Sequence, residues 1–166
     1  MKRRVQFSVS SVFKRAVLQV VGRLVDAHIA QAGLPNHLVF GERDRLSVDP
    51  SAVLNDALIN TMSGRVKLEK HAFLGHRVML LTGTHDTTVF DEERQLGIPS
   101  SGRDICIGRG AWVASGAIVL GPCKIGPHAV IGAGSVVNRD IPPFAIAVGS
   151  PARVIGYVKA PTSTIK

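Results

Sequence analysis

Residues 105–141 read ICIGRGAWVASGAIVLGPCKIGPHAVIGAGSVVNRDI, and their chemistry repeats every six residues. A branched aliphatic residue recurs at six positions, namely Ile107, Val113, Val119, Ile125, Ile131 and Val137. The next residue is glycine or alanine in four of these six units, and the fourth residue after the aliphatic one is mostly small. Neither the 3.6-residue period of an α-helix nor a heptad explains this spacing.

The pattern predicts an all-β fold, a left-handed parallel β-helix of hexapeptide repeats. Each unit supplies one short strand, three units close a triangular coil of about 18 residues, and successive coils stack. Hexapeptide coils of this kind wind left-handed, against the right-handed preference of crossover connections. The aliphatic residues point inward and meet their copies one coil away, so we expect the pairs Ile107–Ile125, Val113–Ile131 and Val119–Val137. We attribute the small residue beside each of them to tight corners, where glycine tolerates a positive φ.

The composition agrees with a narrow interior of this kind. The chain of 166 residues is 45% hydrophobic but only 5% aromatic, with 21 Val, 12 Ile and 17 Gly. Such hydrophobicity excludes a disordered chain, and the glycines lack the strict period of collagen. The chain has two cysteines, too few for a disulfide framework.

The same spacing continues upstream with less regularity. Leu68, Leu74 and Leu80 predict another coil, and Val48 with Leu54 begins an earlier one. The two segments are out of phase, which indicates an irregular corner between them.

These observations divide the chain into three parts. We expect an N-terminal arm over 1–45 with an amphipathic helix at 11–33, a β-helix domain over 46–158, and a tail over 159–166. Within the domain a polar segment at about 86–100 breaks the pattern and predicts an excursion loop.

The formal net charge is +8, and the arm carries much of it, with eight basic and three acidic residues. A nucleic-acid partner is not expected, because the arm lacks interleaved aromatic residues and the rest lacks a dense basic run. Phosphate ligands or a membrane surface explain the charge equally well. No convincing secretion signal begins the chain, so we expect a cytoplasmic protein, with contact to the inner membrane surface through the arm as an option.

Residues 105–156 resemble the C-terminal half of the hexapeptide-repeat acyltransferases, nearest to maltose and galactoside acetyltransferases and bacterial polysaccharide O-acetyltransferases. The segment LLTGTHDTTVFDEERQLGIPSSGRDICIG (80–108) is similar to the catalytic-histidine segment and loop of that branch. The resemblance covers about residues 46–158. It implies a homotrimer with acetyl-CoA between adjacent prisms, no metal, and acetyl transfer to a carbohydrate hydroxyl in surface polysaccharide biosynthesis.

The resemblance implies that His85 is the catalytic residue. A sugar hydroxyl is a poor nucleophile, and a histidine with a pKa of about 6.5 can take its proton during attack on a thioester. Sequence chemistry alone leaves open that His85 is an ordinary polar loop residue. Cys106 and Cys123 occupy repeat positions expected to be structural, which disfavours an acyl-cysteine route.

Other positions follow from the resemblance, each with plain coil structure as the alternative. The expected acetyl-CoA contacts are Trp112, Ser115, Ala133, Asn138, Arg139 and Arg153. Asn60 is the expected acceptor ligand; alternatively it is a corner residue with left-handed φ. Asp86 and Glu93 are expected to orient His85 or to contact the acceptor.

Three other functions are compatible with the same fold. The same donor groove would serve N-acetylation of an amino sugar or a nucleotide sugar. A γ-type carbonic anhydrase holds a metal with three histidines, and His71, His76 and His37 are the candidates for such a set. A non-catalytic scaffold is the third alternative.

Overall fold

The computed structural model describes residues 17, 19–24 and 36–159, and the chain divides into two units, 1–35 and 36–166. In the first unit residues 17 and 19–24 are helical. The remainder of the helix predicted over 11–33 lies outside the described residues, so that helix stays a prediction. Within the described part, no helix combines the length and the apolar character needed to cross a membrane.

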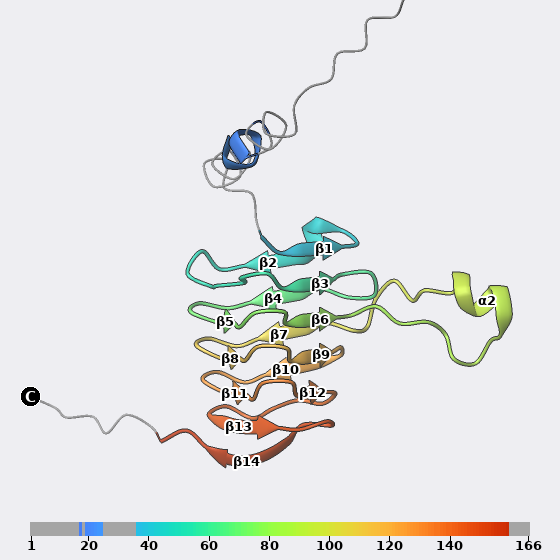
Figure 1. Cartoon of the computed structure of the whole chain (residues 1–166). Helices are drawn as coiled ribbons and strands as arrows, with labels where there is room; N and C mark the ends of the chain where they lie inside the picture. The colour runs from blue at the N-terminus through green and yellow to red at the C-terminus, as the bar shows by residue number, and fades with distance from the viewer. Residues whose placement is uncertain (1–16, 18, 25–35, 160–166) are drawn as a thin grey trace, which may run out of the picture. The chain divides into compact units, whose positions relative to one another are not determined.

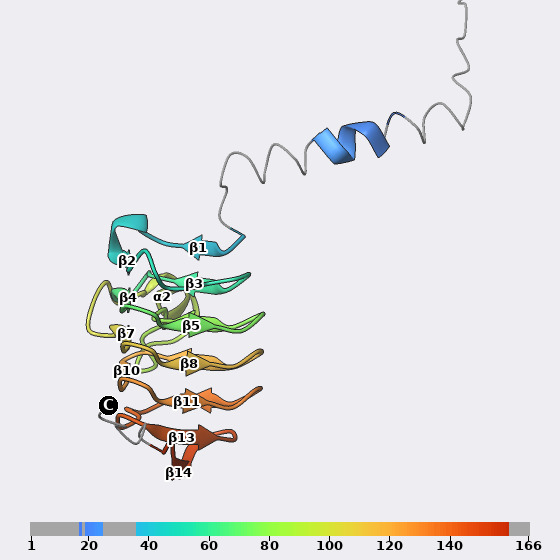
Figure 2. The same cartoon turned by 90° about the vertical axis from the view of Figure 1, so that its left-hand side faces the viewer.

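The second unit is a three-sided parallel β-helix (Figure 1). Sheet A has the strand order β1-β3-β6-β9-β12, sheet B the order β10-β7-β4-β2, and sheet C the order β14-β13-β11-β8-β5. Figure 2 shows the sheet C strands stacked in line. The strands are β1 (Leu38–Phe40), β2 (Leu46–Val48), β3 (Leu58–Asn60), β4 (Val66–Leu68), β5 (Phe73–Leu74), β6 (Met79–Leu81), β7 (Ile105–Ile107), β8 (Trp112–Val113), β9 (Ile118–Leu120), β10 (Cys123–Ile125), β11 (Val130–Ile131), β12 (Val136–Val137), β13 (Ala145–Val148) and β14 (Arg153–Tyr157).

The predicted stacking of aliphatic residues is confirmed. Ile107 pairs with Ile125, Val113 with Ile131 and Val119 with Val137 in parallel ladders. The upstream coil joins the same columns, since Leu68, Leu74 and Leu80 pair with Ile107, Val113 and Val119. All nine side chains are buried, so they form the interior of the prism.

The expected reason for the small residue beside each aliphatic residue is wrong. Gly108 has no positive φ, and the left-handed residue falls two positions later, at Gly110. A Cβ on Gly108 would lie 2.7 Å from both the carbonyl oxygen of Ile125 and the nitrogen of Pro127. The close approach of the next coil therefore excludes a side chain at Gly108.

The excursion loop is longer than predicted. It leaves sheet A after β6 and returns at β7, so it spans 82–104, and it contains the short helix α2 (Asp91–Leu96). Figure 1 shows the loop projecting from the corner between sheets A and B.

Further strands pair with the repeat at both ends of the prism. β1 pairs with β3, so the first paired strand lies upstream of residue 46, and the 3-10 helix η1 (Arg43–Arg45) follows it. At the other end β14 pairs antiparallel with β13.

The three sheets differ in the side chains that alternate with the buried ones. Sheet A presents an apolar row and sheet C an apolar and aromatic row, whereas the row on sheet B is polar. The rows are Leu58, Met79, Ile118 and Val136 on sheet A; Phe73, Trp112, Val130 and Ile146 on sheet C; and Ser47, Lys67, Cys106 and Lys124 on sheet B.

Candidate active site

His85 lies on the excursion loop, four residues after β6 ends, and its side chain is exposed. Its Nδ1 lies 2.9 Å from the backbone carbonyl oxygen of Arg94. A carbonyl oxygen only accepts hydrogen bonds, so Nδ1 must be the donor and carry the ring proton. The neutral imidazole therefore has its lone pair on Nε2, the arrangement that a general base needs.

The loop holds this carbonyl in place through its own contacts. Arg94 belongs to α2, its Nε donates to the carbonyl of Val89 at 2.7 Å, and its guanidinium lies 4.7 Å from the centre of the Phe90 ring. The amide of Asp86 donates to the carbonyl of Gly97 at 3.1 Å and joins the two limbs of the loop. The residue types give no indication of this partner of His85, because a backbone carbonyl has no signature in the sequence.

One arginine joins the two ends of the loop, and a second attaches the loop to the prism. Nε of Arg103 donates to the carbonyl of Thr82 at 2.8 Å, which fixes the start of the loop. Nη1 of Arg45 donates to the carbonyl of Ser100 at 2.9 Å, which fixes its return. His85 is thus held on a segment anchored at both limbs.

Asn60 ends β3, beside the start of the loop. Its Oδ1 accepts the amide of Met62 at 2.9 Å, and its Nδ2 would lie 2.7 Å from a Cβ on Gly83. Asn60 therefore packs against the backbone two residues before His85. The alternative of a left-handed Asn60 is wrong, because the asparagine with positive φ is Asn55, at 48°.

The two acidic candidates lie on the same loop. Oδ1 of Asp86 accepts the hydroxyl of Thr88 at 2.6 Å and its amide at 2.8 Å, and these bonds lower the pKa of Asp86. Asp86 therefore stays ionised. Glu93 is exposed, and its carboxylate has no hydrogen bond or ion pair with any residue that the structure describes. A contact of either carboxylate with an acceptor stays a prediction.

The expected acetyl-CoA residues lie at three places, two of them corners of the prism. Ser115 and Ala133 occupy the corner between sheets C and A, where the amide of Gly134 donates to the carbonyl of Ser115 at 3.0 Å. Asn138 and Arg139 follow β12 at the corner between sheets A and B, and both are exposed.

Trp112 and Arg153 belong to sheet C. Trp112, the single tryptophan of the chain, is 43% exposed and stacks on Phe73 with ring centres 5.8 Å apart. Arg153 is exposed on β14, and its Nη1 donates to the carbonyl of Ala152 at 2.9 Å.

One chain does not bring all these residues together. β6 and β9 are parallel neighbours in sheet A. His85 lies beyond the carboxyl end of β6, whereas Ser115 precedes the amino end of β9, so the two residues lie at opposite edges of the sheet. Asn60, Asp86 and Glu93 lie on the His85 side.

The three histidines that are candidates for metal ligands lie apart from one another. His71 precedes β5 and His76 follows it, so they occupy different corners of the prism, and His37 precedes β1. Among the described residues no three side chains of the metal-binding types cluster. The three candidate histidines of the carbonic anhydrase alternative therefore do not come together among the residues that the structure describes.

Neither cysteine has the environment of a nucleophile. Burial raises the pKa of Cys123 to about 12, and its Sγ donates to the carbonyl of Arg139 at 3.1 Å. Burial also raises the pKa of Cys106. Because the thiolate is the reactive form, both thiols are poorly reactive at neutral pH.

Residues 107–139 match the family described as bacterial transferase hexapeptide (six repeats). The chain thus carries the hexapeptide repeat of this transferase family over these residues. The matched span covers the coils from β7 to the corner after β12. The parallel sheets and the solved relatives of this family fit a left-handed β-helix.

The chain is similar to two curated acetyltransferases and to one solved structure. A dTDP-3-amino-3,6-dideoxy-alpha-D-galactopyranose 3-N-acetyltransferase of Aneurinibacillus thermoaerophilus is 46% identical over 67 residues, 40% of this chain and 34% of that protein. The galactoside O-acetyltransferase of Escherichia coli is 47% identical over 51 residues, 31% of this chain and 25% of that protein. The structure of a galactoside acetyltransferase in complex with coenzyme A is 27% identical, covers 74% of this chain and 60% of that chain, and has a TM-score of 0.61.

The matches cover only part of the relatives. The chain spans between about a third and about half of the length of the first curated relatives that it matches.

Proposed function

We propose that the chain is an acetyl-CoA-dependent acetyltransferase that acts on a carbohydrate hydroxyl, with His85 as general base. One observation carries the proposal. The bond from Nδ1 of His85 to the carbonyl of Arg94 leaves Nε2 as the nitrogen with the lone pair in the neutral imidazole of an exposed side chain. The bound coenzyme A named for the galactoside acetyltransferase structure supports acetyl-CoA as the donor.

In the proposed reaction Nε2 of His85 takes the hydroxyl proton while the sugar oxygen attacks the thioester carbonyl carbon. The carbon–sulfur bond then breaks, and the departing thiolate recovers the proton from the imidazolium. Base catalysis of this kind contributes about 10²- to 10⁴-fold to the rate. Asn60, Asp86 and Glu93 lie on the same side of the prism and would contact the acceptor.

A homotrimer is part of this proposal. His85 and the pair Ser115 and Ala133 occupy opposite edges of sheet A, so two copies are needed for one site. The apolar rows on sheets A and C provide surfaces that association would bury. Trp112 and Arg153 on sheet C, and Asn138 and Arg139 after β12, would contact the donor in that assembly.

N-acetylation of an amino sugar or a nucleotide sugar is the second candidate. The 46% identity to the Aneurinibacillus N-acetyltransferase favours it. A neutral amine attacks a thioester without losing its proton first, whereas a hydroxyl needs a base during attack. Loss of the His85 imidazole should therefore affect hydroxyl transfer more than amine transfer.

The setting that we propose is surface polysaccharide biosynthesis in the cytoplasm or at the inner membrane surface. The net charge of +8 supports anionic partners such as coenzyme A phosphates or anionic lipids. The basic arm over 1–45 lies largely outside the described residues, so its membrane contact rests on sequence alone.

The test measures thiol release from acetyl-CoA with a panel of sugars, amino sugars and nucleotide sugars. On the best hydroxyl acceptor, His85→Gln should lower kcat by about 10²- to 10⁴-fold. The matched control is His71→Asn, an exposed histidine at another corner whose φ of 60° suits asparagine, and it should leave turnover unchanged. Full turnover by His85→Gln would refute its role, and a stable monomer in sedimentation would refute the shared site.

A further inference from the structure

Sheet B is the polar side of the prism. Its outward row of Ser47, Lys67, Cys106 and Lys124 contrasts with the apolar rows of sheets A and C. Association through the apolar rows would leave sheet B facing solvent. A ligand could therefore reach this sheet in the monomer and in the assembly.

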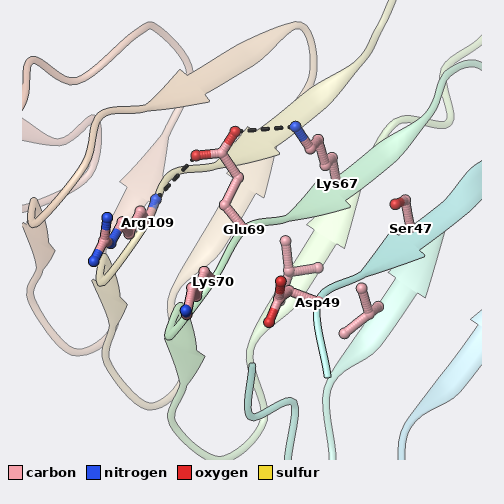
Figure 3. A pocket seen from close by; sticks show the side chains of 8 residues that line it. Ser47, Asp49, Lys67, Glu69, Lys70 and Arg109 are labelled. Carbon is pink, nitrogen blue, oxygen red and sulfur yellow. Dashed lines mark hydrogen bonds and ion pairs between the residues drawn. The ribbon is translucent and has the colours of Figure 1, made fainter. Parts of the chain in front are cut away.

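A cavity of about 360 Å³ opens where sheet B meets the next corner (Figure 3). Its polar lining residues come from three successive coils, and its volume lies in the range of small-molecule sites. They are Ser47, Asp49, Lys67, Glu69, Lys70 and Arg109. His85 lies on the loop at the corner between sheets A and B, so the cavity is separate from the proposed transfer site.

The two carboxylates of the cavity have partners within the chain. Oδ1 of Asp49 accepts the hydroxyl of Ser51 at 2.6 Å and its amide at 2.9 Å. Oε1 of Glu69 accepts Nζ of Lys67, and Oε2 accepts the amide of Arg109, both at 3.1 Å. These bonds hold the pKa of both carboxyls below their usual values, so both stay ionised at neutral pH.

Two cations of the cavity, unlike its carboxylates, have side chains without such partners among the described residues. Nζ of Lys70 and the guanidinium of Arg109 make no hydrogen bond or ion pair with the residues that the structure describes. The amide of Gly110 donates to the carbonyl of Lys70 at 3.0 Å, and the amide of His128 donates to the carbonyl of Arg109 at 2.8 Å. Lys70 and Arg109 therefore occupy equivalent positions of adjacent coils, and Figure 3 shows their side chains on the same side of the cavity.

We propose that this cavity binds an anionic monosaccharide unit. The carboxylate or phosphate of the sugar would lie between Lys70 and Arg109, whose charged donors form strong hydrogen bonds with such groups. The ionised carboxylates of Asp49 and Glu69 have further lone pairs and would accept sugar hydroxyls. An extended anionic surface fits less well, because the same carboxylates would repel it.

The inference goes beyond the proposed transfer site, and only its choice of a sugar over another small anion rests on the proposed function. If the acceptor is an acidic glycan, the cavity would hold one sugar unit of that glycan at a distance from the reacting hydroxyl. It adds a second carbohydrate contact on a face that the transfer chemistry does not use.

Titration calorimetry of the full 166-residue chain without acetyl-CoA tests the inference. Glucuronic acid and glucose 1-phosphate distinguish a carboxylate from a phosphate, and glucose is the neutral probe. Arg109→Gln should weaken binding of the charged sugars at least tenfold. Lys124→Gln removes one exposed charge from the same sheet outside the cavity and should leave binding unchanged. Glucose should bind at least tenfold more weakly than the charged sugars.

Several outcomes would overturn the inference. The first two are that Arg109→Gln binds the charged sugars as tightly as the wild-type protein, or that Lys124→Gln loses as much affinity as Arg109→Gln. The other two are that neither charged sugar binds, or that inorganic phosphate binds as tightly as glucose 1-phosphate. The His85→Gln variant should bind the charged sugars normally. Absence of thiol release by the wild-type protein on every acceptor, with intact binding of the charged sugars, would therefore count against the proposed function alone.

Discussion

Gly108 provides a direct test of how the coils stack. In Gly108→Ala the new methyl carbon would lie 2.7 Å from the carbonyl oxygen of Ile125 and from the nitrogen of Pro127, whereas ordinary contacts begin at 3.4 Å. Both atoms belong to the backbone of the next coil. The amide of Gly108 donates to that same carbonyl at 2.8 Å, so the coils cannot separate without stretching this bond.

The magnitude follows from this overlap. Overpacking a rigid interior by one methyl group costs about 1–3 kcal/mol of unfolding free energy. Each kcal/mol shifts Tm by roughly 2–8 °C, depending on domain size. We therefore expect the steric cost by itself to lower the Tm by at least about 2 °C.

The assay is a thermal melt followed by circular dichroism at equal protein concentration. Gly156→Ala is the matched control, because its Cβ would meet nothing within 4 Å and its φ is not positive. Both substitutions reduce the entropy of the unfolded chain, by about 0.4–1 kcal/mol, so the difference between them isolates the steric cost. Equal Tm values for the two variants would refute coil spacing as the reason for glycine at position 108.

Three further predictions concern the loop, the interior and the donor groove. Arg103→Ala removes the bond to the carbonyl of Thr82. It should speed limited proteolysis of the loop and lower kcat at least tenfold. The control Arg65→Ala should change neither the proteolysis rate nor kcat. Burial holds the folded pKa of Cys123 at about 12, above its unfolded value, so stability should fall as pH rises above about 9. Urea unfolding at pH 8 and pH 10.5 should show a smaller fall for Cys123→Val, and an equal fall would contradict this assignment. Titration with coenzyme A should change the fluorescence of Trp112, the single tryptophan, and an unchanged spectrum at saturation would remove it from the donor groove.

Much of the prism could be predicted from the sequence. The spacing of Ile107, Val113 and Val119 identified their partners one coil away, because a fixed period determines which residues stack. The same spacing located the excursion loop, although not the helix α2 inside it. The role given to Gly108 was wrong, since sequence spacing does not distinguish a positive φ from close backbone approach.

The sequence by itself determined the repeat, the interior columns and the resemblance that points to His85. Only the tertiary structure identified the carbonyl of Arg94 as the partner of His85 and assigned Ser115 to the opposite edge of sheet A. It also brought Lys70 beside Arg109, 39 positions away, because the excursion loop lies between their coils. The physical reason is that a local repeat fixes neighbours within the stack, whereas contacts made by backbone carbonyls or across an irregular loop depend on the path of the folded chain.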